Sequence, residues 1–344
     1  MAQQHITDLA PEIRAWGQKQ FGASDAAITP QSGGANNQVY LWENATGRAI
    51  VKLYGPPTQG MPDRFIAEAE FLEYANTVAE DFVPHLLNSD SDLRVVAMEY
   101  IEGGNFDGNA RPTLADIQRA SEFLRLLNSD HSTARQLITN HAADGFLRLT
   151  EHAQNTEQRI DSLASDHLPR AFQKSSNALI SNVKQSWVGV NRKLTGALSE
   201  GTIVDELDEK YCCLSPSDFG FHNSISSAKG TKFHDFEFAG WDDPTKAVVD
   251  FFLQPRIRIS SGHIPLMQEA IASTIPIDIL QRRTTILSSI LQVKWITIVL
   301  AVLRPERLET MLKVNVRQSA EDLISERLRR GNELLTEGAI VGLS

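Results

Sequence analysis

Two short polar clusters set in apolar sequence constrain the fold of this chain more than any other feature. The first is the segment 214–223, LSPSDFGFHN, in which Asp218 stands five positions before Asn223. The second, FHDFEFAGWDDP, begins ten residues later; we expect a strand over 233–238 that carries Asp235, and then a Gly-Trp turn. A fold that uses both clusters has to bring these three polar side chains together.

The residue types in these clusters suit phosphoryl transfer. A carboxylate can orient an attacking hydroxyl group and accept its proton, and Asp and Asn oxygens are ligands that Mg²⁺ prefers. Asp218 is therefore the candidate catalytic base. Asn223 and Asp235 are the candidate magnesium ligands, since Asp-x4-Asn followed by Asp-Phe is the polar skeleton of a kinase active site.

The N-terminal part of the chain predicts an antiparallel sheet with a glycine-containing loop. The predicted elements are a helix within 5–22, strands over 27–32, 38–43 and 48–54, a turn at 33–37 and a hairpin turn at 44–47. Gly33 and Gly34 would let the backbone approach phosphates closely, although a Gly-Gly turn is also common in a plain hairpin. No Gly-x4-Gly-Lys-Ser/Thr sequence is present, which excludes a P-loop NTPase.

Lys52 and Glu68 are each anomalous in their predicted elements. Lys52 lies inside an apolar strand, where it either faces water at an edge or needs an anionic partner. In the predicted helix 63–79, Glu68 falls in the middle of the apolar face. A Lys52–Glu68 ion pair explains both positions, with Glu70 as the alternative partner.

These motifs together resemble the aminoglycoside phosphotransferase family, the kinase-fold enzymes that act on small molecules such as aminoglycosides and choline. The family loop reads His-Gly-Asp-x4-Asn, and here Pro216 and Ser217 replace the His and the Gly. The segment DFEFAGWDDP closely matches the family's activation segment, and the resemblance covers roughly residues 27–255. The family's Gly-Gly-x-x-Asn-x-Val-Tyr is matched by Gly33, Gly34, Asn37, Val39 and Tyr40.

The resemblance implies an α+β, two-lobed protein-kinase-like fold. An N-lobe with an antiparallel sheet would span 1–103, and a mainly helical C-lobe would span 104–344, with a catalytic loop at 214–223 and a metal-binding activation segment at 233–244. It also implies ATP or GTP with Mg²⁺, and an aminoglycoside-, sugar- or amino-alcohol-like acceptor. The nucleotide-binding residues it implies are Gly33, Gly34, Asn37, Lys52, Glu68, Met98, Glu99 and Ile101.

Two alternatives to a small-molecule kinase stay open. Pro216 cannot donate the hydrogen bond of the residue it replaces, so Ser217 or His222 would have to substitute, or the chain would be a nucleotide-binding pseudokinase with a regulatory or scaffolding role. The four groups that the chemistry uses are all present, which favours an active enzyme. A protein kinase is disfavoured because no Ala-Pro-Glu sequence follows Asp235.

Composition narrows the partners and the compartment. The net charge of −10 argues against nucleic acid or an anionic membrane, and mildly favours a cationic or neutral acceptor. No secretion signal is visible at the N-terminus, and the apolar segment 286–303 contains Lys294, which indicates a buried helix and not a membrane span. Adjacent Cys212 and Cys213 rarely pair, which favours a reducing cytoplasm, and no zinc-binding spacing occurs.

The rest of the chain predicts helices around these motifs. A strand over 92–102 is expected before a Glu-Gly-Gly break, and a strand over 210–214 before the catalytic loop, with both cysteines as packing residues. Helices are expected over 114–150, 151–200, 247–253 and 266–344. The polar helices within 151–200 are either an acceptor-recognition insertion or an ordinary helical layer. Asp250 is a candidate brace for the catalytic loop.

Overall fold

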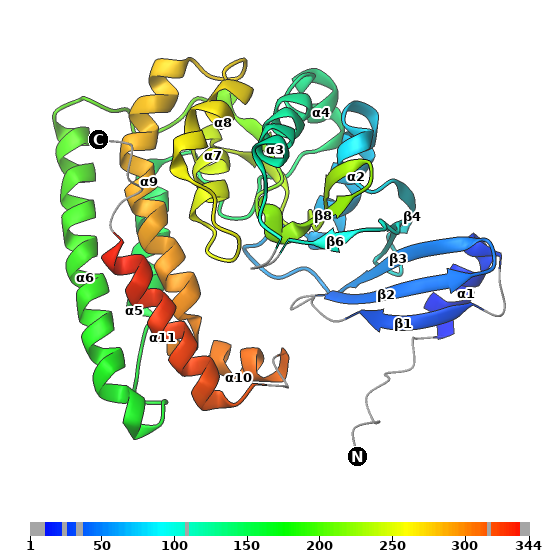
Figure 1. Cartoon of the computed structure of the whole chain (residues 1–344). Helices are drawn as coiled ribbons and strands as arrows, with labels where there is room; N and C mark the ends of the chain where they lie inside the picture. The colour runs from blue at the N-terminus through cyan, green and yellow to red at the C-terminus, as the bar shows by residue number, and fades with distance from the viewer. Residues whose placement is uncertain (1–10, 23–25, 32–36, 107–109, 315–317, 338–344) are drawn as a thin grey trace. The chain divides into compact units, whose positions relative to one another are not determined.

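The structure, a computed structural model, describes residues 11–22, 26–31, 37–106, 110–314 and 318–337. The chain forms two compact units that alternate along the sequence (Figure 1). The first contains Met1–Ala143 and Leu214–Trp241, and the second contains Asp144–Cys213 and Asp242–Ser344. The predicted lobe boundary at residues 103 and 104 is a different division of the chain, and it stays a prediction.

The first unit is built on a five-stranded antiparallel sheet in the order β1-β2-β3-β5-β4. The described elements from Pro11 to Glu99 are the five strands, two α-helices and one short 3-10 helix: α1 (Pro11–Phe21), β1 (Ala27–Gln31), β2 (Asn37–Asn44), β3 (Gly47–Tyr54), α2 (Arg64–Val78), η1 (Glu80–Phe82), β4 (Leu86–Asp90) and β5 (Val95–Glu99). The predicted helix, the three predicted strands and the hairpin turn are confirmed. The Asn44 side chain closes that turn by accepting from the backbone N–H groups of Thr46 and Gly47, at 2.8 and 3.0 Å.

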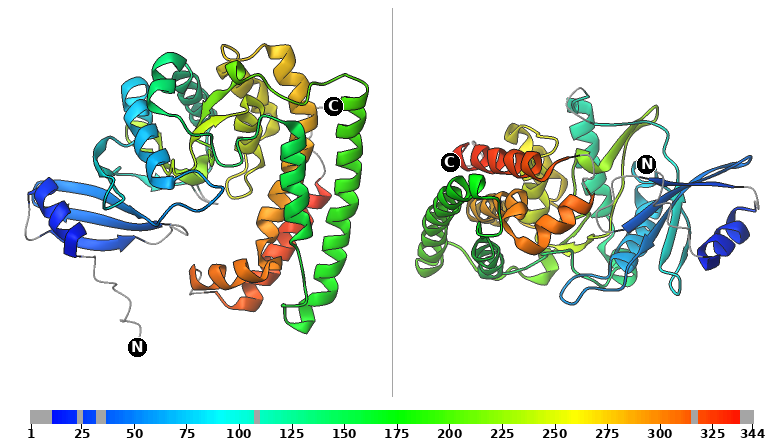
Figure 2. Two further views of the ribbon diagram at one scale, coloured as in Figure 1. Left: turned by 180° about the vertical axis from the view of Figure 1, so that it is seen from behind. Right: turned by 90° about the horizontal axis from the view of Figure 1, so that it is seen from below.

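The two faces of this sheet carry different helices (Figure 2). Ile13 and Trp16 of α1 pack on Trp42 and Val51, in one buried apolar cluster. Because side chains alternate along a strand, Lys52 points to the opposite face, and there it meets α2. The alternation therefore aims one lysine away from the apolar cluster and toward the helix that carries its partner.

The remaining elements of the first unit hold the two polar clusters. They are β6 (Gly104–Asn105), α3 (Leu114–Leu127), α4 (His131–Leu137), β7 (Cys213–Ser215), η3 (Phe221–Asn223), β8 (Ser224–Ser227), β9 (Gly230–Phe233) and β10 (Gly240–Asp242). The first residue of β7, Cys213, and the last of β10, Asp242, are counted with the second unit. Strands β6, β8 and β9 form one sheet, and β7 pairs with β10. Asp116 of α3 accepts from the Thr231 hydroxyl at 2.6 Å, and Phe123 stacks on Phe233 with ring centroids 5.3 Å apart. These contacts fix β9 on α3, and so fix the start of the segment that carries Asp235.

The second unit is helical. Its elements are α5 (Leu149–Asp161), α6 (Arg170–Ser199), η2 (Glu209–Tyr211), α7 (Pro244–Leu253), η4 (Ser261–His263), α8 (Ile264–Ala270), α9 (Ile277–Val299), η5 (Leu300–Leu303), α10 (Pro305–Val314) and α11 (Ala320–Thr336). Helix α9 is central, because α5, α6, α7 and α11 all pack against it. Residues 277–303 are long and apolar enough to cross a membrane, yet the apolar window is 67% buried inside the protein. The predicted buried helix is confirmed, and it begins earlier than expected.

Two predicted strands are shorter than expected. Only Val95–Glu99 of the strand predicted over 92–102 is a strand, because the Asp90 side chain accepts from the backbone N–H groups of Asp92 and Leu93, both at 3.0 Å, and forms a turn. The strand predicted over 210–214 begins at Cys213, since Glu209–Tyr211 forms a 3-10 turn. Both cysteines are buried, as expected of packing residues, and neither forms a disulfide.

The prediction for the second polar cluster is wrong in its local structure. The strand ends at Phe233, so Asp235 lies beyond it with φ 70° in the left-handed region. Gly240 and Trp241 form strand β10 instead of a turn. A Cβ atom at position 240 would lie 2.6 Å from the backbone nitrogen of Ala142, so this strand needs a glycine.

Candidate active site

Asp218 is held by two side chains of its own loop. His222 Nε2 lies 3.1 Å from Asp218 Oδ1, and Asn223 Nδ2 donates to Oδ2 at 3.1 Å. The Asp218 side chain is 39% exposed, so its carboxylate has room for a further donor. A carboxylate that is oriented yet open to solvent suits the predicted role of a base.

Asn223 links the two polar clusters. Its side-chain N–H groups are used on Asp218, including the Asp218 carbonyl oxygen at 3.0 Å, which fixes the orientation of the amide. Its backbone carbonyl accepts from the His234 N–H at 3.0 Å. With the nitrogen committed to Asp218, the amide oxygen is the atom of Asn223 that remains for a ligand, immediately beside the segment of Asp235.

Asp235 faces Lys52. Its Oδ1 atom lies 2.6 Å from Lys52 Nζ, and its side chain is 36% exposed. Burial raises the pKa of Asp235, but the charge and hydrogen bond of Lys52 lower it more, so the net pKa lies below the usual value. The group is therefore a carboxylate at neutral pH, and one of its oxygens makes no hydrogen bond within the described residues.

The predicted Lys52–Glu68 ion pair is confirmed. Lys52 Nζ lies 2.9 Å from both oxygens of Glu68, which is fully buried. Burial lowers the pKa of Lys52, but Glu68 and Asp235 raise it further, so it lies above the usual value and the ammonium stays charged. The alternative Glu70 does not contact Lys52. Burial and Glu73 raise the pKa of Glu70.

Two groups at Glu68 were not predicted from the sequence. The Tyr54 hydroxyl donates to Glu68 Oε2, and the Phe236 N–H donates to Oε1 at 3.4 Å. Tyr54 is two positions after Lys52 in β3, and the alternation of side chains along a strand places both on one face. This alternation is the sequence feature from which the contact of Tyr54 could have been predicted. Phe236 contributes its backbone N–H, which cannot be predicted from the residue type.

The predicted nucleotide-binding positions lie at the strand ends of the same unit. Met98 is buried in β5. The Glu99 N–H is used on the His85 carbonyl at 2.8 Å, and its carboxylate pairs with the buried Lys232 at 3.0 Å, which lowers the pKa of Glu99 against the effect of burial. Ile101 follows the strand and makes no backbone hydrogen bond within the described residues. The pairing of Glu99 with Lys232 was not predicted.

The glycine loop can be followed only in part. Gly33 and Gly34 lie outside the described residues. Asn37 begins β2, and its amide donates to the buried carboxylate of Glu237. The loop's last predicted residue is thus anchored to the second polar cluster.

The donor set fits a hard cation. The partly exposed carboxylate of Asp235 and the amide oxygen of Asn223 are oxygen ligands of the kind that Mg²⁺ takes in proteins. In the described part of the chain, no three His, Cys, Asp or Glu side chains gather into a metal site. Two protein ligands would leave the remaining positions of Mg²⁺ to substrate oxygens and water, as is usual for this ion.

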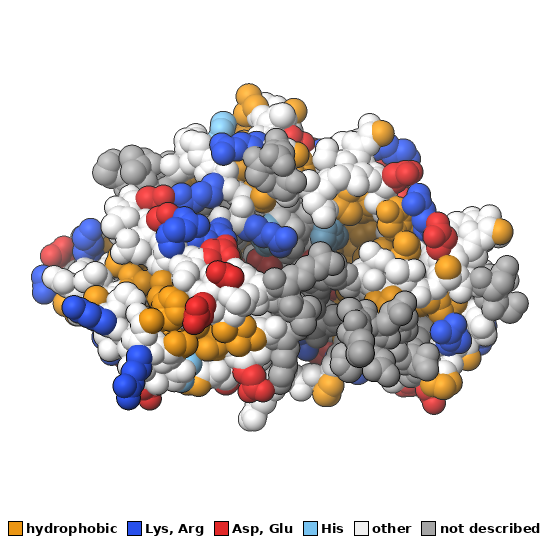
Figure 3. Space-filling view, turned by 60° about the horizontal axis from the view of Figure 1, so that its bottom comes forward, with side chains coloured by type: hydrophobic (Ala, Val, Ile, Leu, Met, Phe, Trp, Pro, Cys, Tyr) orange, Lys and Arg blue, Asp and Glu red, His pale blue; other side chains and the backbone are white. Residues whose placement is uncertain are grey.

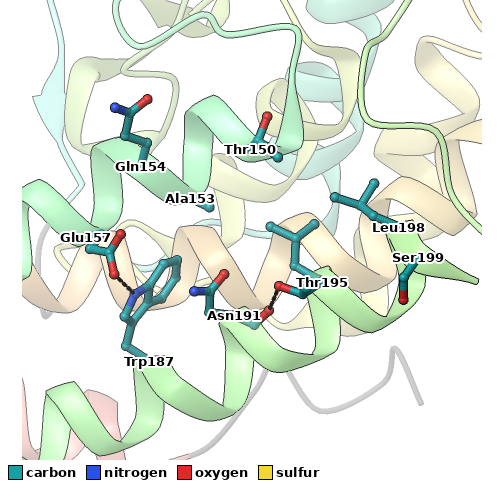
Figure 4. Close-up of a pocket in the computed structure, with 10 residues that line it drawn as sticks. Thr150, Ala153, Gln154, Glu157, Trp187, Asn191, Thr195, Leu198 and Ser199 are labelled. Carbon is teal, nitrogen blue, oxygen red and sulfur yellow. Dashed lines mark hydrogen bonds between the residues drawn. The ribbon is translucent and has the colours of Figure 1, made fainter.

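A separate hollow of about 530 Å³ lies in the second unit between α5 and α6 (Figure 4). The Trp187 indole donates to Glu157 there at 3.4 Å, and Gln154 and Asn191 also line it. It contains no residue of the candidate site. The two interpretations of residues 151–200 therefore stay open.

Comparison with known proteins places the fold. No protein-family model matches the chain, and no curated protein matches it. Similar solved structures include a choline/ethanolamine kinase family protein from Mesorhizobium loti, with 14% identity over 94% of each chain and a TM-score of 0.54. Spectinomycin phosphotransferase APH(9)-Ia with ADP and spectinomycin has 11% identity over 94% of this chain and 98% of its own, with a TM-score of 0.59. Choline kinase from Cryptosporidium parvum Iowa II has 12% identity, 96% and 98% coverage, and a TM-score of 0.56.

The chain has a protein-kinase-like fold. The predicted fold class is confirmed, and the predicted resemblance is confirmed at the level of the fold. Nearly the whole chain takes part in the likeness, while the resemblance of motifs covers roughly 27–255. The likeness therefore extends beyond residues 27–255 into the C-terminal helices, whose sequence carries no recognisable motif.

Proposed function

We propose that this protein is a phosphotransferase that moves the γ-phosphoryl group of ATP or GTP to a hydroxyl group of a small molecule. The contact of Lys52 with both Glu68 and Asp235 supports this most strongly, since it joins β3, α2 and the second polar cluster in one ionic group. The His234–Asn223 hydrogen bond connects that group to the loop of Asp218. The protein-kinase-like fold agrees with this proposal.

In this mechanism Asp218 orients the acceptor hydroxyl and takes its proton, which contributes typically 10²- to 10⁴-fold to the rate. The Asn223 amide donates to its carboxylate at 3.1 Å, which orients it. Asn223 and Asp235 would hold Mg²⁺, which when bound neutralises charge on the phosphates.

The nucleotide would lie against the strand ends of the first unit. Lys52, fixed by Glu68, would contact its phosphates, and the loop of Gly33, Gly34 and Asn37 would cover them. Met98 would line the adenine or guanine pocket, with backbone groups of Glu99 and Ile101 at the base edge. The Glu99 N–H already has an acceptor, which leaves its carbonyl oxygen and the Ile101 backbone for the base.

The acceptor is proposed to be an aminoglycoside-, sugar- or amino-alcohol-like molecule. The similar structures are described as spectinomycin phosphotransferase, choline kinase and choline/ethanolamine kinase family proteins. On the face drawn in Figure 3, acidic side chains lie beside basic ones, so the net charge of −10 does not form one acidic field there. We also propose a cytoplasmic protein that uses neither nucleic acid nor a membrane.

The test is a coupled ATP-consumption screen against sugars, amino alcohols and aminoglycosides, with Mg·ATP binding measured by thermal shift. Asp218→Ala should keep nucleotide binding and lose turnover by at least about 10²-fold. Asp235→Ala should lose magnesium-dependent nucleotide binding. Asp166→Ala removes an exposed carboxylate elsewhere and should change neither property. Normal turnover by Asp218→Ala would refute the assignment, and binding of Mg·ATP without turnover of any acceptor would favour a pseudokinase.

A further inference from the structure

His222 contacts the candidate base, although the mechanism above assigns it no chemistry. Its side chain is only 10% exposed, and its Nε2 atom lies 3.1 Å from Asp218 Oδ1. Its other ring nitrogen, Nδ1, is buried and has no hydrogen-bond partner among the residues that the structure describes. Within that part of the chain the ring makes a single polar contact, and that contact is with the base.

The contact with Asp218 and the burial of Nδ1 decide which ring nitrogen carries a proton. If Nδ1 carried it, a buried N–H would lack an acceptor, and the Nε2 lone pair would face a carboxylate oxygen. If Nε2 carries it, the N–H donates to Asp218 and only a lone pair is left unpaired. Because an unsatisfied buried donor costs about 1–3 kcal/mol and the first arrangement adds repulsion, the Nε2–H tautomer is favoured.

The same geometry shows no path for a proton relay through the ring among the described residues. A relay needs a second partner that takes the proton onward from Nδ1, and none of the described groups supplies one. His222 is thus placed to orient the carboxylate. Neither Pro216 nor the Ser217 side chain donates to Asp218 within the described residues, so His222 and Asn223 are the side chains that hold it.

We propose that His222 is a positioning residue that holds the Asp218 carboxylate through an Nε2–H hydrogen bond, one donor on each oxygen together with Asn223. The proposal depends on the proposed role of Asp218 as the base. Asn223 also has its amide oxygen to offer to Mg²⁺, so a second donor keeps the carboxylate oriented independently of the metal ligand. His222 is neither a base nor a ligand in this arrangement.

Two substitutions separate hydrogen bonding from other roles of the ring. His222→Leu removes the donor and should lower kcat about 10- to 100-fold, the range expected when a hydrogen bond to a charged group is lost, while KM for the nucleotide stays unchanged. His222→Gln places an amide N–H near the Nε2 position and should restore most of the lost kcat. His263→Leu, at a partly exposed position of the second unit, is the control and should match the wild type.

A measurement without turnover tests the contact itself. Nitrogen-15 NMR of the wild-type ring should show the Nε2–H tautomer of His222, and Asp218→Ala should move the Nε2 resonance. A wild type that phosphorylates no acceptor but shows this tautomer and shift would refute the proposed function and keep the contact. An Nδ1–H tautomer, an unchanged kcat in His222→Leu, or a His222→Gln variant as slow as His222→Leu would each overturn the proposal.

Discussion

Each compact unit holds a buried lysine between two carboxylates, and the two groups differ in how far water reaches the acids. In the first unit, Lys52 lies 2.6 Å from Asp235, whose side chain is 36% exposed. In the second, Lys246 lies 2.6 Å from Asp242, whose side chain is fully buried. The distances are the same, so it is exposure that separates a carboxylate able to bind a ligand from one closed inside a helical core.

The second group is closed by further partners. Asp250, 3.7 Å from Lys246, accepts from the Trp295 indole at 2.7 Å, and Asp242 accepts from the Asp243 N–H at 2.9 Å. The predicted role of Asp250 as a brace of the catalytic loop stays a prediction, because its contacts lie within its own unit. A lysine between two acids therefore does not identify a site by itself.

Backbone conformation marks the same difference. Asp235 has φ 70°, and a non-glycine residue there costs of order 1–3 kcal/mol, whereas Asp242 lies in an ordinary strand. Strain of this kind persists where the surrounding structure holds it, and it gathers at functional sites. Substitution in the group of Lys52, Glu68 and Asp235, the open group, should change mainly activity. Substitution in the group of Lys246, Asp242 and Asp250, the closed group, should change mainly stability.

The largest expected effect is on the closed group. Lys246→Met leaves two buried carboxylates without their ammonium, which should lower the free energy of unfolding by about 3–5 kcal/mol. Denaturant unfolding measures this value, and turnover per folded molecule should stay near wild type. Lys184→Met, at an exposed position of α6, should stay within about 0.5 kcal/mol. A loss no larger than that of Lys184→Met would contradict a structural role for Lys246.

Asp235→Asn is the matched change in the open group. Lys52 keeps Glu68 as its partner, so we expect a change in unfolding free energy of no more than about 1 kcal/mol. Turnover should fall by about 10²- to 10³-fold, because a group that stabilises transition-state charge is lost. Steady-state kinetics measures the turnover, and denaturant unfolding of the same preparation measures the unfolding free energy. If Asp235→Asn is strongly destabilised but turns over normally when folded, the pairing of Lys52 with Asp235 has a structural role, like that of Lys246 with Asp242.

The sequence predicted the ion pair because two local anomalies had one common solution. Lys52 interrupts an apolar strand and Glu68 interrupts an apolar helix face, and both facts are visible in a window of a few residues. The helices of the second unit were predicted for a similar reason, since apolar periodicity is local. Family resemblance then supplied the two-lobed fold, which periodicity alone does not give.

The conformation of Asp235 could not be predicted in this way. Its apolar neighbours predict a strand, but the hydrogen bond from the His234 N–H to Asn223 is the last in the register of β8 and β9. The backbone then turns to φ 70° at Asp235, whose carboxylate pairs with Lys52, 183 positions away in the chain. The contact of His222 with Asp218 depends on the same loop geometry. Tertiary contacts of this kind leave no local pattern, so the sequence named the site residues without the geometry that links them.

Tyr54→Phe tests how firmly the open group is built. The variant removes one of the donors to Glu68 and leaves Lys52 in place, so the unfolding free energy should fall by about 1.5–3 kcal/mol, the range for a hydrogen bond to a charged group. Affinity for Mg·ATP, measured by titration calorimetry, should weaken several-fold, since Lys52 is held less firmly. Tyr211→Phe, at a half-buried position of η2, is the control. An unchanged affinity would show that Tyr54 stabilises the fold without positioning Lys52.

The smallest effect is a pH dependence that belongs to the closed group. Burial and the neighbouring Asp250 and Asp243 raise the pKa of Asp242 to about 6, in spite of Lys246. An acid whose pKa is higher in the folded state than in the unfolded state stabilises the fold at low pH, and this contribution is lost as pH rises through 6. From pH 7 to pH 5, Asp242 should therefore add about 1 kcal/mol to the free energy of unfolding.

The total stability will not show this directly, because two histidines act in the opposite sense. Burial lowers the pKa of His152 to about 3 and that of His234 to about 4, so both destabilise the fold as pH falls below their usual pKa. The difference between the wild type and Asp242→Asn removes their effect, since both proteins carry the same histidines. Denaturant unfolding at pH 5, 6 and 7 should show the wild type gaining about 1 kcal/mol on the variant toward pH 5. If the difference in unfolding free energy between the two proteins is constant with pH, Asp242 stays ionised throughout. The charge of Lys246 would then stabilise the Asp242 carboxylate as fully as the charge of Lys52 stabilises that of Asp235.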